Sequence, residues 1–180
     1  NTAIDALNGT RNALDPDAID QAATLLQRAR QVFCFGQGGS SLLASDIWAR
    51  FATISTKFHT SGDSHMQAIA ASLMGPEDVV LFVSYSGATR DMMDTLRLAK
   101  DNGAKVILLT HYDDAPGTVL ADVVLLCGAK ESPLDSGSMP VKLAVLFVAN
   151  VLVLRYTLDN QELVSLSRER TTKALGNKLL

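Results

Sequence analysis

The sequence has little cysteine and little net charge. Its 180 residues include two cysteines, Cys34 and Cys127, each inside an apolar run, so we expect buried free thiols in a reducing compartment, with a disulfide as the less favoured alternative. No CxxC pair or cluster of cysteine and histidine occurs, so we expect no metal site. The net charge of −3 leaves no basic surplus for the phosphates of a nucleic acid, so this chain alone is not expected to bind DNA.

Long hydrophobic runs are also missing. Residues 1–30 are rich in Asp, Arg and Gln and contain no apolar segment typical of a signal peptide. The longest apolar run, residues 143–154, contains Asn150 and is shorter than the about 18–20 residues that a spanning helix needs. We therefore expect a soluble, cytoplasmic chain without a membrane partner. Because the sequence starts at Asn1 rather than at a methionine, we also expect it to be a fragment of a longer protein.

The chain alternates short apolar strands with amphipathic helices, which is typical of a parallel sheet covered by helices on both faces. We predict an α/β protein: a three-layer α/β/α sandwich with a five-stranded parallel sheet in the flavodoxin-like order 2-1-3-4-5. The helical segment or connector of residues 1–29 is expected to precede a main domain of residues 30–180. The predicted strands are 32–35, 56–60, 79–83, 106–109 and 123–126, and the predicted helices are 15–29, 40–53, 64–74, 89–102, 138–158 and 161–175.

Two Gly/Ser-rich loops carry the chemistry. Residues 36–41 and 84–89 each follow a predicted strand and open a predicted helix. Glycine lets backbone N–H groups turn toward a ligand, and the start of a helix supplies unpaired N–H donors with partial positive charge. Hydroxyl groups add neutral donors to phosphate oxygens. Each loop alone is most simply a turn with a helix cap, and Thr89 in particular is a good N-cap residue.

The predicted strand order brings the two loops together. Strands one and three are neighbours whose connections leave in opposite directions, and open α/β sheets bind ligands at such a switch point. We therefore predict one anion site at the carboxyl ends of these strands, with a phosphate held by Ser40, Ser84, Ser86 and Thr89.

Two nucleotide-binding alternatives fit the residues poorly. A Walker loop needs a Gly-Lys-Ser/Thr sequence, and neither loop contains lysine. A dinucleotide fingerprint needs a third glycine where Ser41 stands, and the second strand ends at His59 and Thr60 with no acid before Asp63. We therefore expect no nucleotide cofactor, and no other cofactor.

Residues 84–89 read Ser-x-Ser-Gly-x-Thr, which resembles the phosphate loop of the SIS (sugar isomerase) domain. Residues 38–40 resemble the first loop of that family. Residues 63–67 and 136–139 narrow the resemblance to the effector domain of RpiR-type transcriptional regulators. The similarity covers about residues 30–158. By resemblance, the phosphosugar site would contain Gly38, Gly39, Ser40, Ser84, Ser86, Gly87 and Thr89.

The resemblance implies a SIS fold and a regulatory role. In such regulators an N-terminal helix-turn-helix domain binds DNA, while the SIS domain senses a sugar phosphate and dimerises. This chain would be the sensing part of a regulator of carbohydrate metabolism, and the DNA-binding domain would be missing from it. The sequence names neither the sugar nor the target genes.

An aldose–ketose phosphosugar isomerase is the alternative function. Isomerisation needs a base that moves a proton between adjacent carbons. The candidates are Glu131, His65 and His111, and Glu131 lies near the position of a catalytic glutamate in the enzyme branch of the family. Because a sensor also needs groups that bind sugar hydroxyls, Glu131 and His65 are candidate phosphosugar ligands in either case. Tyr85 replaces a glutamine common in the enzymes, and we favour the sensor.

Residues 143–154 predict a helix that is apolar nearly all round. A helix of this kind is buried on every side. One face can pack on the sheet and the other on a further helix or on a second subunit. We therefore expect a homodimer, with a tetramer as the alternative.

Overall fold

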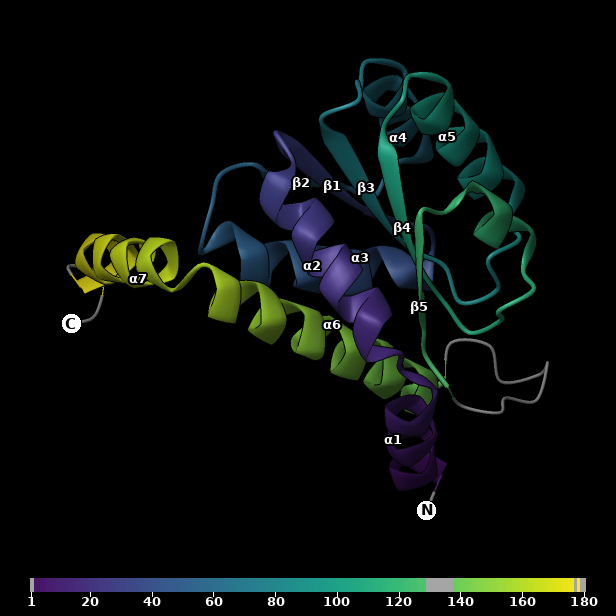
Figure 1. Ribbon diagram of the computed structural model, residues 1–180, viewed down its shortest axis with the longest axis horizontal. Coiled ribbons are helices and arrows are strands. Elements are labelled where there is room, and N and C mark those ends of the chain that lie inside the picture. Colours follow the sequence, from purple (N-terminus) through teal and green to yellow (C-terminus); the bar gives the residue numbers. More distant parts are fainter. Residues whose placement is uncertain (1, 129–137, 177, 179–180) are drawn as a thin grey trace.

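The computed structural model describes residues 2–128, 138–176 and 178. One parallel sheet runs in the order β2-β1-β3-β4-β5, as predicted (Figure 1). Its strands are β1 Gln31–Gly36, β2 Phe58–Ser61, β3 Asp78–Val83, β4 Lys105–Thr110 and β5 Val123–Leu126. The helices are α1 Thr2–Ala13, α2 Pro16–Arg28, α3 Gly39–Ala52, α4 Ser64–Ser72, α5 Arg90–Asp101, the 3₁₀ helix η1 Pro116–Leu120, α6 Met139–Asp159 and α7 Gln161–Gly176.

Helices cover both faces of the sheet and form two core clusters. α2, α3 and α6 pack on one face, where Cys34 and Leu81 belong to their cluster. α4 and α5 pack on the other face, where Phe35 and Phe82 belong to the second cluster. Every residue of β3 is buried, as expected for a central strand covered on both sides. The predicted three-layer sandwich is confirmed.

α6 is 21 residues long, and its length and composition alone would suit a membrane span. In the fold it is a core helix that packs against α1, α2 and α3. Its buried residues are Val141, Ala144, Val145, Val148, Ala149, Leu152 and Tyr156. Burial inside this chain therefore accounts for only part of its apolar sequence: 39% of its apolar window is buried, and Leu154 and Leu158 are 55% and 62% exposed, so the helix is not buried on every side as predicted.

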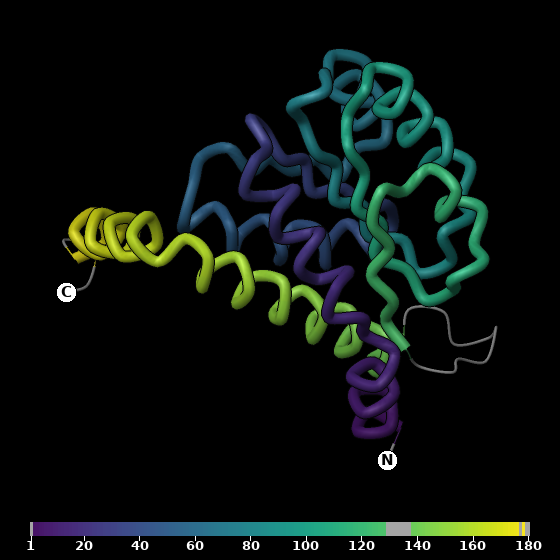
Figure 2. The backbone as a smooth tube through the Cα atoms, in the orientation of Figure 1, coloured from purple at the N-terminus to yellow at the C-terminus, as the bar shows by residue number. Residues whose placement is uncertain are grey.

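The two terminal helices lie at the ends of α6 (Figure 2). The first predicted segment, left open as a helix or a connector, is the helix α1, and it packs on α6. α7 extends away from the sandwich, with Val164 as its buried residue. The hydroxyl of Ser167 donates to the carbonyl of Ile54 at 2.8 Å and ties α7 to the loop after α3.

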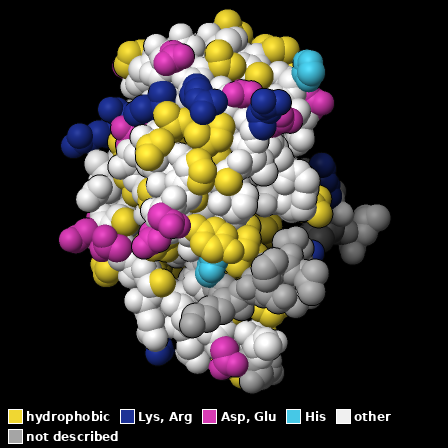
Figure 3. Space-filling view, turned by 90° about the vertical axis from the view of Figure 1, so that its right-hand side faces the viewer, with side chains coloured by type: hydrophobic (Ala, Val, Ile, Leu, Met, Phe, Trp, Pro, Cys, Tyr) yellow, Lys and Arg dark blue, Asp and Glu magenta, His cyan; other side chains and the backbone are white. Residues whose placement is uncertain are grey.

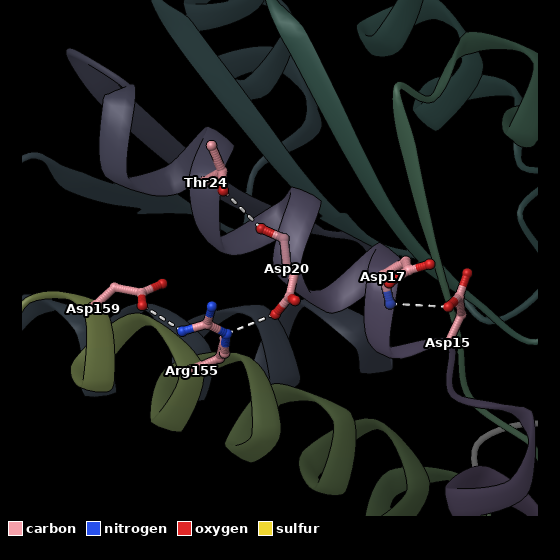
Figure 4. Close-up of polar contacts among 6 residues, drawn as sticks. All are labelled: Asp15, Asp17, Asp20, Thr24, Arg155 and Asp159. Carbon is pink, nitrogen blue, oxygen red and sulfur yellow. Dashed lines mark hydrogen bonds and ion pairs between the residues drawn. The ribbon is translucent and has the colours of Figure 1, made fainter.

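The start of α2 follows its predicted cap, and an ion-pair cluster joins α2 to α6 (Figure 4). The Asp15 carboxylate accepts from the backbone N–H of Asp17 at 2.9 Å, with proline at the first helical position. Arg155 of α6 donates to Asp20 at 2.6 Å and to Asp159. These carboxylates raise the pKa of Arg155 chiefly through the hydrogen bond from its guanidinium to Asp20. The cluster fixes the long apolar helix against α2.

Candidate functional site

The first loop connects β1 to α3. Gly38 stands at the N-cap of α3 with a φ of 54°. The backbone N–H of Ser40 donates to Gln37 O at 3.0 Å, and the Ser41 hydroxyl donates to Gly38 O at 2.7 Å. The predicted strand–glycine–helix arrangement is therefore present, and it places Ser40 in the first turn of α3.

The second loop connects β3 to α5, and two of its backbone N–H groups donate to serine hydroxyls of the same loop. The backbone N–H of Gly87 donates to Ser84 Oγ at 3.1 Å, and the N–H of Ala88 donates to Ser86 Oγ at 3.3 Å. Gly87 has a φ of 59°, and a side chain there would come within 2.6 Å of the Ala115 side chain. The loop therefore needs glycine at this turn. Thr89 occupies the N-cap position of α5 as predicted, but its side chain makes no capping hydrogen bond, because its hydroxyl donates to Gln37 instead.

The two loops meet at one cavity. β1 and β3 are neighbours with Gly36 opposite Val83, so the two loops leave the sheet side by side. The Thr89 hydroxyl donates directly across to Gln37 Oε1 at 3.3 Å. The cavity has a volume of about 530 Å³. Its lining includes Gln37, Gly39, Ser40, Leu43, Phe82, Val83, Ser84, Tyr85, Ser86, Thr89, Val141, Lys142 and Val145. The structure therefore brings Ser40 together with Ser84, Ser86 and Thr89.

Sequence reasoning missed the contribution of α6. Its first turns supply Val141, Lys142 and Val145 to the wall of the cavity. Among the described lining residues, Lys142 is the one charged side chain and no carboxylate occurs. The helices α3 and α5 also begin at this cavity, and helix N-termini carry partial positive charge. The described electrostatics of the cavity thus favour an anion.

Gln67 was also missed, although residues 63–67 drew attention as part of the resemblance. Asp63 caps α4 by accepting from the backbone N–H of Met66 at 2.8 Å. Gln67 is fully buried, and its Nε2 donates to Gly36 O at 2.9 Å and to Ser61 O at 2.7 Å. It therefore ties the ends of β1 and β2 together directly beneath the first loop.

The remaining candidates lie apart from the cavity or outside the described residues. His65 is exposed on the first turn of α4 and does not line the cavity. His111 Nδ1 lies 2.8 Å from Cys127 O, and its ring stacks on Tyr85 at 4.8 Å between centroids. Gly38 and Gly87 shape the loops without lining the cavity. Glu131 lies outside the described residues.

No metal cluster or disulfide is found in the described part of the chain. No group of three or more His, Cys, Asp or Glu side chains gathers there in a way that could hold a metal ion. Cys34 and Cys127 are buried and are not joined in a disulfide. Burial raises the pKa of the Cys34 thiol to about 12, so this thiol stays protonated at neutral pH.

One face of the molecule gives an independent view of its charge. In Figure 3, Lys and Arg side chains on this face are interspersed with Asp and Glu. Two cationic side chains of α5 are paired with carboxylates: Lys100 with Asp122 at 2.9 Å and Arg97 with Asp94 at 3.0 Å. Most of the Lys and Arg side chains in this view lie in one band across the upper part of the face, and Asp and Glu side chains lie beside several of them.

The fold and the cavity define a class: a doubly wound α/β domain with its pocket at the topological switch point of the sheet. Comparison with known proteins makes the assignment specific. The chain belongs to the SIS domain family, whose sequence pattern matches residues 25–155.

Its relatives include bacterial transcriptional regulators. The chain is 30% identical over 175 residues to an HTH-type transcriptional regulator of Haemophilus influenzae, covering 97% of this chain and 61% of the relative. It is 31% identical over 161 residues to the HTH-type transcriptional regulator RpiR of Escherichia coli, covering 89% of this chain and 54% of RpiR. The chain thus spans little more than half the length of these relatives. They are regulators rather than enzymes, as expected for a sensor.

A solved structure agrees with this assignment. The NanR protein of Vibrio vulnificus, solved in complex with ManNAc-6P, matches with a TM-score of 0.93 and 25% sequence identity. The match covers 99% of this chain and 67% of the NanR chain. The resemblance to the SIS domain and to RpiR-type regulators is confirmed.

Proposed function

We propose that this chain is the sugar-phosphate-sensing effector part of a transcriptional regulator of carbohydrate metabolism. The observation that carries the proposal is the meeting of Ser40, Ser84 and Ser86 at one cavity that also contains Lys142. The similarity to NanR, a regulator solved with a sugar phosphate bound, supports the same function.

The phosphate is held by the two loops. Ser40, Ser84, Ser86 and Thr89 supply hydroxyl donors, and the first turns of α3 and α5 supply backbone N–H groups and partial positive charge. Lys142 of α6 adds a full positive charge to the lining of the same cavity. A dianionic phosphate therefore meets donors from three helices.

The rest of the ligand fills the remaining space. A cavity of about 530 Å³ lies within the range of about 300–1,000 Å³ that is common for small-molecule sites. Leu43, Val141 and Val145 provide apolar surface beside the polar loops. A monosaccharide phosphate matches this combination of volume, charge and polarity.

A ligand screen tests the function. A panel of sugar phosphates, ManNAc-6P included, is assayed by thermal shift against the same sugars without phosphate. A ligand at about 100 times its Kd adds about 2.7 kcal/mol to the free energy of unfolding. We expect at least one sugar phosphate to stabilise the protein while its unphosphorylated counterpart does not. A panel in which no sugar phosphate stabilises the protein would contradict the proposal.

A double variant tests the site. Replacing both Ser84 and Ser86 by alanine removes two hydrogen bonds to a charged group, each worth about 1.5–3 kcal/mol. The affinity for the best sugar phosphate in the panel should fall at least about tenfold. Ser72→Ala is the matched control, because Ser72 is exposed on α4 and its hydroxyl donates to Ile69 O at 2.7 Å. Unchanged affinity in the double variant would place the phosphate elsewhere.

The assembly belongs to the same proposal. Leu154, Leu158, Leu163 and Leu166 of α6 and α7 remain between 41% and 62% exposed, and α7 extends away from the sandwich. A homodimer would cover such surface. Light scattering should return twice the chain mass of 19.2 kDa, and a monomer at micromolar concentration would contradict the dimer.

DNA binding is assigned to a part outside this chain. The relatives are HTH-type regulators of which the chain spans 61% or less, so the DNA contact is proposed to come from a helix-turn-helix domain of the whole protein. A regulator of this kind works in the cytoplasm, where bacterial DNA lies. The division into a helical segment of residues 1–29 and a main domain of residues 30–180 remains part of the proposal. Leu26 of α2 lies before this division and still belongs to the core cluster.

A further inference from the structure

A chain of side-chain hydrogen bonds runs from the core to the cavity. Gln67 is buried beneath the first loop, Gln37 lines the cavity, and Thr89 lies across it on the second loop. Gln37 Nε2 donates to Gln67 Oε1 at 3.4 Å, and the Thr89 hydroxyl donates to Gln37 Oε1 at 3.3 Å. The three residues thus connect both loops through one amide, that of Gln37.

Donor counting fixes the orientation of that amide. A glutamine side chain has two N–H donors and one carbonyl oxygen. Both donors of Gln67 go to backbone carbonyls, those of Gly36 and Ser61, so only its oxygen is left to face Gln37. Gln37 must therefore turn its NH₂ group toward Gln67. Its own oxygen then points toward Thr89 and the cavity, where it can only accept.

Thr89 has a single hydroxyl proton, and in this structure the proton goes to Gln37 Oε1. A phosphate bound by the second loop accepts the hydrogen bond from the Thr89 hydroxyl in place of Gln37 Oε1. Gln37 Oε1 then needs another donor, because a ligand filling the cavity keeps water from it, and a covered acceptor without a partner is costly. A phosphate dianion offers no donor, so within the ligand the group that can supply one is a hydroxyl or amide N–H of the sugar.

We propose that Gln37 is a specificity-determining residue whose Oε1 accepts a hydrogen bond from a hydroxyl or amide N–H of the sugar, and that Gln67 is the positioning residue that holds Gln37 in this orientation. The inference rests on the proposed sugar-phosphate function and adds a requirement to it. A sugar phosphate that lacks a donor group beside its phosphate-bearing end is a poor ligand, however well its phosphate is held.

The test compares one residue with one ligand group at a time. The probes are the panel member that stabilises the protein most and its analogues in which a single hydroxyl or amide group is replaced by hydrogen. The wild-type chain should bind one of these analogues about five- to tenfold more weakly than the parent. In Gln37→Leu the parent should bind as weakly as that analogue, while the affinity for the analogue changes less than about twofold.

Gln27→Leu is the matched control, since Gln27 is exposed on α2, and it should discriminate as the wild-type chain does. A Gln37→Leu variant that still discriminates against every analogue as the wild type does would overturn the proposal. So would a variant that binds the parent and all analogues more weakly by the same factor, because Gln37 would then only support the loop.

The role of Gln67 is tested by the same ratio of affinities. Gln67→Leu should bring the affinities for the parent and the analogue closer together, as Gln37→Leu does. Combining the two substitutions should bring these affinities no closer than Gln37→Leu alone. If Gln67 had a purely structural role, Gln67→Leu would weaken the binding of parent and analogue by the same factor. This loss of affinity would then add to the loss caused by Gln37→Leu. If Gln67→Leu does not fold, Gln37→Leu decides the proposal alone. Failure of the underlying function has a separate signature: no sugar phosphate of the panel would then stabilise the wild-type protein.

Discussion

The hydroxyl of Thr10 in α1 lies 2.9 Å from the carbonyl oxygen of Gly128, just beyond the end of β5. Thr10 is fully buried, and its hydroxyl also lies 2.7 Å from Ala6 O within the same helix. α1 packs in addition on α6, the helix whose first turns line the cavity. The N-terminal helix is thus held both by the end of the sheet and by a wall of the candidate site.

Replacing Thr10 by valine keeps the shape of the side chain and removes the hydroxyl. Because the Gly128 carbonyl loses a part-buried hydrogen bond, whose donor hydroxyl it shares with Ala6 O, we expect the free energy of unfolding to fall by about 1 kcal/mol. Thr24→Val is the matched control, since Thr24 makes the same bond within its helix, to Asp20 O at 2.9 Å, but is exposed on α2. Urea unfolding of both variants checks this. Equal losses would show that the hydrogen bond from Thr10 to the Gly128 carbonyl contributes nothing to stability.

The parts of this fold that the sequence predicts are those with a local physical signal. Four of the five strands are short apolar runs and the start of α2 has a carboxylate cap, so these elements and their order follow from local pattern and crossover rules. β2 begins at Phe58, later than predicted, because residues 56 and 57 still belong to a turn. Beside it, Lys57 Nζ donates to carbonyls at the end of α2, the nearest being Leu26 O at 2.6 Å. That contact joins residues 31 positions apart and has no signature in the local sequence.

The candidate site likewise has features that the local sequence predicts and features that only the folded structure shows. Glycine and hydroxyl residues at strand ends are visible in the sequence, and their convergence follows from the strand order. Lys142 is hidden in an apolar stretch, and only the packing of α6 brings it to the cavity. His65 and Gln67 are two residues apart on α4, so about 200° of rotation separates their side chains, and with Gln67 inward His65 faces solvent.

Lys142 should contribute directly to phosphate affinity under the proposed function. Replacing it by methionine keeps most of the apolar stem and removes the charge, so the Kd of the best sugar phosphate should rise about tenfold or more. The affinity should also become less sensitive to salt, because one charge pair has been removed. Isothermal titration at two ionic strengths measures both effects. Lys173→Met on α7, where Lys173 is 76% exposed, is the control, and an equal effect there would deny Lys142 a specific role.

Two glycines of the loops should respond differently to alanine. Both have positive φ, 54° at Gly38 and 59° at Gly87, so each substitution places a side chain on a backbone conformation that glycine adopts far more readily than other residues. At Gly38 no atom lies within 4 Å of the added methyl group, whereas at Gly87 it would meet Ala115 at 2.6 Å and Thr110 Oγ1 at 2.9 Å. We therefore expect Gly87→Ala to lower the thermal midpoint clearly more than Gly38→Ala. Similar midpoints would mean that η1 moves away at little cost.

Asp122 gives the fold a pH dependence with a defined sign. Burial alone would raise the pKa of its carboxyl, but the hydrogen bond from the Val106 N–H and the ammonium groups of Lys100 and Lys105 together lower it below the ordinary value of 3.8. A carboxyl pKa that is lower in the folded state stabilises the protein above the unfolded-state pKa, and this contribution is lost as the pH falls through the folded-state pKa.

Replacing Asp122 by asparagine keeps an acceptor for Val106 and removes the charge. Because the side chain is 24% exposed and screened by water, we expect a loss of about 0.5–1 kcal/mol at neutral pH. The difference from the wild-type chain should shrink below pH 3.8, where Asp122 itself begins to take up a proton. Urea unfolding between neutral pH and acid checks this, with Asp94→Asn as the control because Asp94 pairs with Arg97 at 60% exposure. A difference that stays constant down to the lowest pH would show that Asp122 acts through its shape and not through its charge.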